Sequence, residues 1–271
     1  MAGFGSGITG SLLPGRQPNS GPDHSSSNRG NTMATLVARA GVKRADDAFF
    51  TVMSLVMLAV VLVGFAPSYF LRGAVFAHLP SVLVHLYGAV FSSWIILFVV
   101  QSSLISAGNL RLHRKLGVLG AVIAGLMVVL GVLAPFGTLR RGAELPSFFT
   151  PASFLIGNVI GILIFGAFVA VAIWKRNNAK VHKRIMFIAN AMLMPPALGR
   201  MPFMDAHPYL IGMIPLGMIL ALFVFDLFTW RRPLAVTMIG GLIFFISNPI
   251  VDAVVYTSLA QRITVWAQHH P

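Results

Sequence analysis

Two histidines, His113 and His182, occupy nearly the same local sequence and are the first candidates for chemistry in this chain. Each is followed by two basic residues and an apolar one, and the two patterns lie 69 positions apart, which suggests a weak internal repeat of a two-helix unit. Two imidazoles at one depth could ligate a haem iron from opposite faces, or supply two ligands of a metal ion. The competing interpretation is that each histidine anchors a helix end at the lipid head groups.

Asp226 is the acidic residue that most needs a partner, because it lies between Phe225 and Phe228 in a strongly apolar segment. A carboxylate in such surroundings is costly unless it is paired. The candidate partners are Arg184, Arg231 and the imidazole N–H of either histidine, and the last of these would make Asp226 part of the cofactor site. A structural salt bridge is the favoured interpretation.

A second, weaker candidate site lies toward the opposite side of the predicted bundle, where His85 could bind a metal together with His207. Arg200 and Asp252 fall in the same region, and we expect them to form an ion pair because pairing removes two uncompensated charges from an apolar setting. Catalytic residues stay unassigned, because the sequence contains no phosphate-binding loop, dinucleotide-binding glycine pattern or zinc-protease motif.

The composition defines the environment in which these residues must work. Of 271 residues, 56% are hydrophobic and only 10% are charged, whereas a soluble domain has about 25% charged residues. The 20 basic and 7 acidic residues are clustered between long apolar runs, which argues against a soluble enzyme and against a nucleic-acid-binding protein. The chain contains no cysteine, so disulfides, iron–sulfur clusters and thiolate-ligated haem are excluded.

The apolar runs predict an all-α, polytopic bundle of about seven transmembrane helices, because about 20 helical residues cross the hydrocarbon core. The fifth span is the weakest, since its uncharged part contains Pro195 and Pro196 and covers only roughly 22 Å. It must be extended by its polar ends, broken at the prolines or shielded by neighbouring helices. The predicted spans are 49–71, 82–105, 116–136, 151–174, 184–203, 208–230 and 233–258.

The division of Lys and Arg between alternate sides predicts the orientation of the bundle. Fifteen of the 20 basic residues fall in the N-terminal segment and in the loops around 106–115, 175–184 and 231–232, and the other five fall on the opposite side. The positive-inside rule then places the N-terminus in the cytoplasm and the C-terminus outside, with both histidine motifs on the cytoplasmic side.

Three parts are expected along the chain. Residues 1–44 are predicted to be a disordered, basic N-terminal segment, 45–260 the seven-span transmembrane domain, and 261–271 a short C-terminal tail. Asp46 and Asp47 are well placed to cap a helix that enters the membrane, because acidic side chains favour helix N-termini.

Polar side chains inside the predicted spans are expected to contact protein rather than lipid. Tyr87, Trp94 and Gln101 recur every seven residues and therefore share one helix face, where they could line a cofactor cavity or, more commonly, pack against a helix with one interhelical hydrogen bond. Asn158 and Asn190 are expected to face protein for the same reason.

These motifs together resemble a family of uncharacterised bacterial multi-span membrane proteins, and the resemblance covers most of residues 45–260. It implies a helical protein of the bacterial inner membrane and supplies no activity or cofactor. The chain departs from the family at Tyr87, where the family often has a second histidine, and this departure argues against a metal site at His85. The matching segments are Gly64-Phe-Ala-Pro-Ser-Tyr-Phe70, His85-x-x-Gly88 with Trp94 and Gln101, Leu112-His-Arg-Lys-Leu-Gly117, His182-Lys-Arg-x-Met186 and Asp226-Leu227.

The leading functional hypothesis is a membrane protein that binds haem b or a metal ion on the cytoplasmic side, through His113 and His182 with the support of Asp226, in a redox or cofactor-handling role. Two alternatives remain open. A small-solute transporter or channel is favoured by the interrupted fifth span and the asparagines within spans. A non-catalytic accessory subunit of a larger membrane complex needs no site of its own. The expected partners are the lipid bilayer and other membrane proteins.

Overall fold

The computed structural model describes residues 24–66, 71, 82–145 and 149–269, and every element within these residues is helical. The chain forms two compact units, Met1–Gly41 and Val42–Pro271. The first unit supplies the N-terminal part of α1 (His24–Phe65), and the second contains all the other helices. The predicted all-α helical bundle is confirmed.

Six stretches of the described residues are long and apolar enough to cross a membrane, so the protein is a multi-pass membrane protein. The α5 limits coincide with the predicted span. One of the six is Ala40–Phe65 of α1, and the other five lie in α3 (Val82–Ser106), α4 (Leu110–Arg140), α5 (Pro151–Trp174), α8 (Leu210–Trp230) and α9 (Ala235–Val255).

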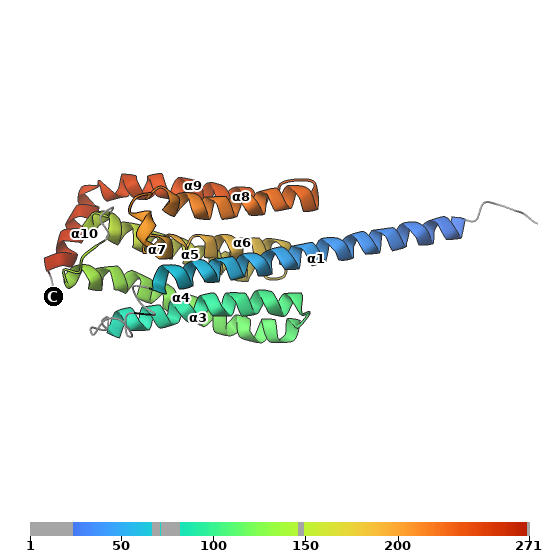
Figure 1. Cartoon of the computed structure of the whole chain (residues 1–271), viewed down its shortest axis with the longest axis horizontal. Coiled ribbons are helices and arrows are strands. Elements are labelled where there is room, and N and C mark those ends of the chain that lie inside the picture. The colour runs from blue at the N-terminus through green and yellow to red at the C-terminus, as the bar shows by residue number, and fades with distance from the viewer. Residues whose placement is uncertain (1–23, 67–70, 72–81, 146–148, 270–271) are drawn as a thin grey trace, which may run out of the picture. The chain divides into compact units, whose positions relative to one another are not determined.

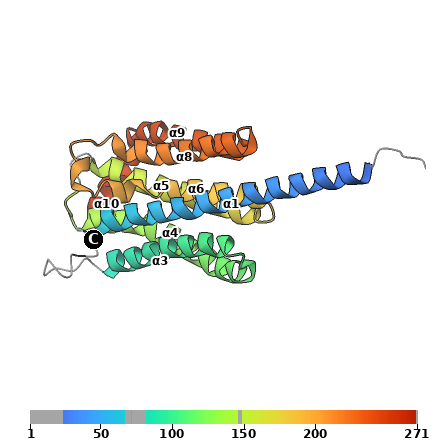
Figure 2. The same ribbon diagram turned by 45° about the vertical axis from the view of Figure 1, so that its right-hand side comes forward.

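Consecutive helices pack as hairpins within the second unit. Contacts join α3 to α4, α4 to α5, α5 to α6 (Ala179–Ala191), and α8 to α9, while α9 also packs on α5 and α6. Figures 1 and 2 both show α5 and α6 between the α3–α4 pair and the α8–α9 pair. The second half of α6 is therefore enclosed by other helices, and the residues Phe187 to Ala191 are all fully buried.

The fifth predicted span is interrupted by the structure. α6 ends at Ala191, a turn follows, and the short helix α7 (Pro195–Leu198) begins at the first of the two prolines. A proline has no N–H to donate to the carbonyl four residues earlier, so the helix cannot continue through this pair. The interruption is shielded, as expected for a backbone that leaves regular helix at membrane depth. The count of seven spans stays a prediction.

Close approach of α1 and α7 depends on Gly64. A Cβ atom at this position would lie 2.6 Å from the carbonyl carbon of Ala197, with the carbonyl oxygen nearer still. Because the obstacle is backbone, it cannot rotate aside. Gly64 therefore allows the end of α1 to cover the interrupted segment.

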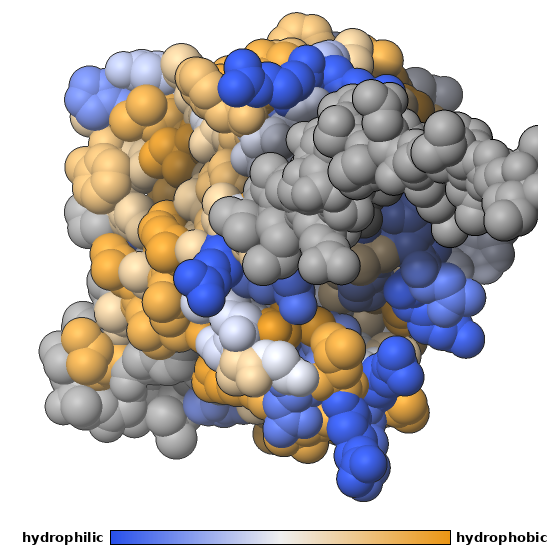
Figure 3. All heavy atoms as spheres, turned by 90° about the vertical axis from the view of Figure 1, so that its right-hand side faces the viewer, coloured by the Kyte–Doolittle hydropathy of each residue, from blue (hydrophilic) through white to orange (hydrophobic). Residues whose placement is uncertain are grey.

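Most exposed positions on the flanks of the spans are apolar, as a lipid-facing surface requires. Val63, Val118 and Phe228 are 59%, 69% and 80% exposed, and many similar residues occur along every span. Figure 3 looks onto the end of the bundle at which α8 and α9 are joined, and it shows hydrophilic residues gathered at that end and apolar residues along the flank.

Both ends of the chain carry more helix than the sequence predicts. α1 begins at His24, inside the segment 1–44 that was predicted to be disordered, while residues 1–23 lie outside the described residues. The C-terminal tail is largely taken up by α10 (Ser258–His269), which packs on α4, α5 and α9. Because α1 starts so early, the proposed capping role of Asp46 and Asp47 is wrong: both residues lie well inside the helix.

Candidate functional site

The two histidine motifs occupy equivalent positions at the starts of α4 and α6. Asn109 caps α4 by accepting a hydrogen bond from Leu112 N–H at 3.1 Å, and Asn178 caps α6 by accepting one from Val181 N–H at 3.3 Å. Each histidine is the fourth residue after its capping asparagine, in α4 as in α6. The shared spacing Asn-x-x-x-His is a further sequence signal for this repeat, which the motif of the histidine and the basic residues after it did not include.

The fold brings the two predicted histidines together. The ring centres of His113 and His182 lie 6.4 Å apart, and the ring planes are nearly perpendicular at 85°. Both side chains are half-buried. The contact is produced by the packing of α5 against both α4 and α6, which brings the starts of the two histidine-bearing helices to the same end of the bundle.

The nitrogen atoms of the pair have different partners. His182 Nδ1 lies 2.8 Å from the backbone oxygen of Ala172. A carbonyl oxygen only accepts, so Nδ1 carries the proton and, in the neutral ring, Nε2 keeps its lone pair. His113 Nδ1 is buried and has no hydrogen-bond partner within the described part of the chain. A buried nitrogen of this kind calls for an explanation such as an absent ligand or water.

Gln101 belongs to the same region of the structure. Its side-chain Oε1 is also buried without a hydrogen-bond partner among the described residues. The Nε2 atom lies 4.0 Å from the position that a Cβ would take at Gly117, which is one helical turn beyond His113. The residue lies on the polar face predicted for the second span, but the sequence alone did not place it beside the histidine motif.

Asp226 is fully buried and is held by Arg184 rather than by an imidazole. Arg184 donates from Nε to both carboxylate oxygens at 2.9 and 3.1 Å, and from Nη2 to Oδ1 at 2.5 Å. Thr237 on α9 donates its hydroxyl to Oδ2 at 2.6 Å. The predicted structural salt bridge is confirmed. Within the described residues the hydrogen-bond donors to Asp226 are therefore Arg184 and Thr237 rather than an imidazole.

The ion pair extends to α1 through Asp46. This side chain is 6% exposed and lies 2.7 Å from Lys183 Nζ and 3.5 Å from Arg184 Nη2. Two carboxylates and two cations from α1, α6 and α8 therefore balance within one buried cluster. Its cations follow directly after His182, so the cluster fixes the start of α6 next to the histidine pair.

The outer candidates, His85 and His207, belong to no group of three metal-ligating side chains among the described residues, and the metal site at His85 stays a prediction. His207 contacts Tyr209, with the ring centres 5.8 Å apart, and His85 is half-buried in α3. No three His, Asp or Glu side chains gather closely enough to hold a metal ion anywhere in the described ranges. Within the described residues, the same finding leaves His113 and His182 without a third His, Asp or Glu ligand.

The expected pair between Arg200 and Asp252 is wrong. Arg200 follows α7, donates to the backbone oxygen of Pro196 and lies over the ring of Phe65, whose centre is 4.6 Å from the guanidinium carbon. Asp252 is exposed on α9. The guanidinium of Arg200 therefore contacts the backbone of the preceding turn and a ring of α1, rather than a carboxylate of α9.

The polar face of α3 is explained chiefly by helix packing. Trp94 Nε1 donates to Asn190 Oδ1 at 2.9 Å, and Asn190 Nδ2 donates to the backbone of Met186 at 2.8 Å. The sequence predicted one interhelical hydrogen bond from this face and an Asn190 side chain that faces protein. Both predictions are confirmed. Asn158 is half-buried and donates to its own helix at Phe154.

Comparison with protein-family models, curated proteins and solved structures found no match for this chain. The resemblance to a bacterial membrane-protein family therefore stays a prediction.

Proposed function

We propose that this membrane protein binds a cofactor whose metal takes two imidazole ligands, either haem iron or a transition-metal ion, between His113 and His182. The observation that carries the proposal is the pairing itself. Two half-buried imidazoles from equivalent positions of a repeat lie with their ring centres 6.4 Å apart. With metal–nitrogen bonds of about 2 Å, two imidazoles on opposite sides of one ion have ring centres roughly 6 Å apart.

The hydrogen bonding of the pair supports the same proposal. A metal-ligating histidine usually donates its second ring N–H to a carbonyl or carboxylate, which fixes the tautomer and the ring orientation. His182 makes such a contact with Ala172, and the buried Nδ1 of His113, which has no hydrogen-bond partner among the described residues, fits a ring nitrogen that ligates a bound group. The two-ligand count suits haem, and it also suits an ion completed by solvent.

We further propose that this site faces the cytoplasm across a bacterial inner membrane. The support is the charge distribution: the basic loops at 106–115, 175–184 and 231–232 belong to the same end of the spans as the histidine pair. A redox or cofactor-handling role follows from the type of ligand. Single cysteines introduced near the two ends of the chain, labelled with a membrane-impermeant reagent in intact cells, test this orientation independently of any cofactor.

The decisive experiment is expression of the full chain with haem precursor and with transition metals supplied, followed by purification in detergent. An absorption spectrum identifies haem, and elemental analysis identifies a metal ion. We expect one of the two to bind in near-stoichiometric amount and to be lost in His113→Ala and His182→Ala. His207→Ala is the matched control, since that histidine is exposed in a loop. Absence of both cofactors from the wild-type protein, or retention in both site variants, would refute the proposal.

Transport of a small solute is a second candidate, and the interrupted helix between Ala191 and Pro195 favours it. Transporters commonly place their binding sites at discontinuous helices shielded by neighbours. The experiment is uptake of labelled solutes into proteoliposomes that contain the full chain. Uptake that depends on the protein and persists in His113→Ala would support transport over the cofactor proposal.

A further inference from the structure

The C-terminal helix α10 exposes its large side chains and buries its small ones. Leu259 and Trp266 are 67% and 48% exposed, although both are residues that a soluble helix would turn toward its core. The buried stripe consists of Ala260, Thr264 and Ala267. The helix thus uses small residues to lie close against the bundle, while a large part of its Leu259, Val265 and Trp266 side chains stays exposed.

The position of α10 identifies the environment of these side chains. The helix starts three residues after α9 ends at Val255, and it packs on α4, α5 and α9. Figure 1 shows it running across the end of these spans rather than along them. An amphipathic helix in this position lies in the plane of the membrane interface, with its apolar residues at the boundary of the acyl chains.

Basic side chains accompany the exposed tryptophan. The guanidinium carbon of Arg140, the last residue of α4, lies 5.4 Å from the ring centre of Trp266, and Phe136 packs on the same ring at 6.3 Å. Arg262 lies one turn before Trp266. The ion pairs among the described residues use Lys183 and Arg184, so neither arginine here has an acidic partner in that part of the chain.

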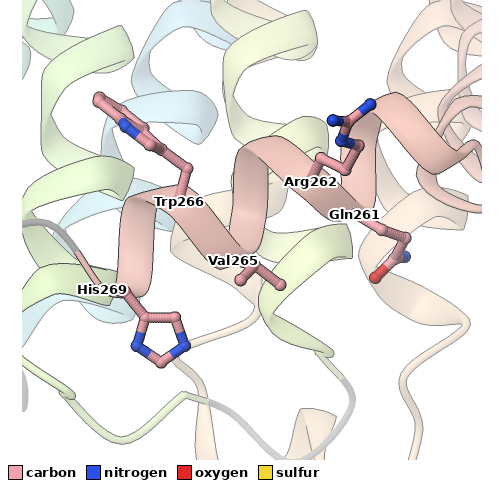
Figure 4. Close-up of a pocket in the computed structure, with 5 residues that line it drawn as sticks. All are labelled: Gln261, Arg262, Val265, Trp266 and His269. Carbon is pink, nitrogen blue, oxygen red and sulfur yellow. The ribbon is translucent and has the colours of Figure 1, made fainter.

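An open depression of about 450 Å³ follows this surface of α10. Figure 4 shows Arg262 and Trp266 extending to one side of the helix, while Val265 and His269 extend to the other side in this view. Gln261 completes the lining. The surface therefore offers a cation, hydrogen-bond donors and an apolar wall beside the end of the membrane spans.

We infer that α10 and the end of α4 bind the head group of an anionic phospholipid, with Arg140 and Arg262 pairing with its phosphate and Trp266 lying at the acyl boundary. Arginine is suited to this task because its planar guanidinium donates two hydrogen bonds to a phosphate at once. Tryptophan is enriched at the interface because its ring is apolar and its N–H is polar. This site is separate from the histidine pair and does not depend on a bound cofactor.

The test uses the fluorescence of Trp266 in the full chain, reconstituted into phosphatidylcholine vesicles. A fixed fraction of lipid is replaced either by brominated phosphatidylcholine or by brominated phosphatidylglycerol, and the Trp266 component is isolated by subtraction of a Trp266→Phe variant. We expect stronger quenching by the brominated anionic lipid, with a preference that falls at high salt. The preference is expected to fall roughly fivefold for each arginine replaced in Arg140→Gln and Arg262→Gln.

Arg232→Gln is the matched control, because Arg232 is an exposed arginine at the opposite end of the spans. It should leave the lipid preference of Trp266 unchanged. Equal quenching of wild-type Trp266 by the two brominated lipids would overturn the inference without reference to any variant. A preference that survives in the double glutamine variant would overturn the assignment of the two arginines.

Discussion

Replacing Asp226 with leucine removes one partner from the buried ion pair and should be strongly destabilising. Asp226 and Arg184 are both fully buried, and the carboxylate accepts hydrogen bonds from Arg184 Nε, Arg184 Nη2 and the Thr237 hydroxyl. The leucine variant keeps the guanidinium in place without its main counter-ion. An unpaired buried charge of this kind costs about 3–5 kcal/mol.

The remaining contacts of Arg184 place the expected loss near the lower end of that range. Its Nη2 atom still lies 3.5 Å from Asp46, and Nη1 donates to the backbone oxygen of Lys180 at 3.0 Å. We therefore expect Asp226→Leu to lose about 3 kcal/mol, which is roughly a hundredfold in the folding equilibrium constant. The double variant Arg184→Met with Asp226→Leu removes both charges and should recover most of this loss.

The assay is equilibrium unfolding of the purified protein in mixed micelles with increasing SDS, followed by circular dichroism. Asp252→Leu is the matched control, since it makes the same change at an exposed position of a span and should shift the unfolding free energy by less than about 0.5 kcal/mol. The reasoning fails if Asp226→Leu stays within about 1 kcal/mol of wild type. It also fails if the double variant loses the sum of the two single losses, because coupled residues must deviate from additivity.

Three further predictions use the same unfolding assay. Gly64→Ala should lower the free energy of unfolding by about 3 kcal/mol, because the new methyl group meets the backbone of Ala197. An unchanged midpoint of the unfolding transition would contradict this packing. Trp94→Phe should lose about 1–3 kcal/mol, since it leaves the buried Asn190 oxygen without its donor, and Trp94→Phe with Asn190→Leu should lose less than the single change. Asn178→Ala should lose about 1 kcal/mol by removing the cap of α6, whereas Asn178→Asp should retain stability.

The helices that cross the membrane were largely predictable because the bilayer makes apolar length decisive. The predicted span 151–174 coincides with α5, and 82–105 differs from α3 by one residue. The prediction of spans was weakest for the fifth segment, where the length of the apolar run does not decide whether the helix crosses the membrane. The uncharged part of segment 184–203 is too short to cross alone, and only the packing of α6 and α7 inside the bundle shows how the prolines interrupt it.

The histidine site was half predictable. The repeated motif predicted that His113 and His182 lie at the same depth, and only the packing of α4 and α6 on α5 places their ring centres 6.4 Å apart. The sequence offered no means of choosing the partner of Asp226, since Arg184, Arg231 and the histidines all lie near the same predicted depth. That choice depends on how α6 and α8 are rotated about their axes, and a linear pattern carries no information about rotation between separate helices.

The sequence by itself determined the class of this protein: a multi-pass helical membrane protein whose few charges must be paired or lie at its ends. This follows from transfer energetics, which act on each segment separately. The tertiary structure decided which charges meet, joining Asp46 to Lys183 and Arg184 and separating Arg200 from Asp252. Pairing is a property of side chains within a few ångströms of each other, and only the packing of the helices brings distant positions that close.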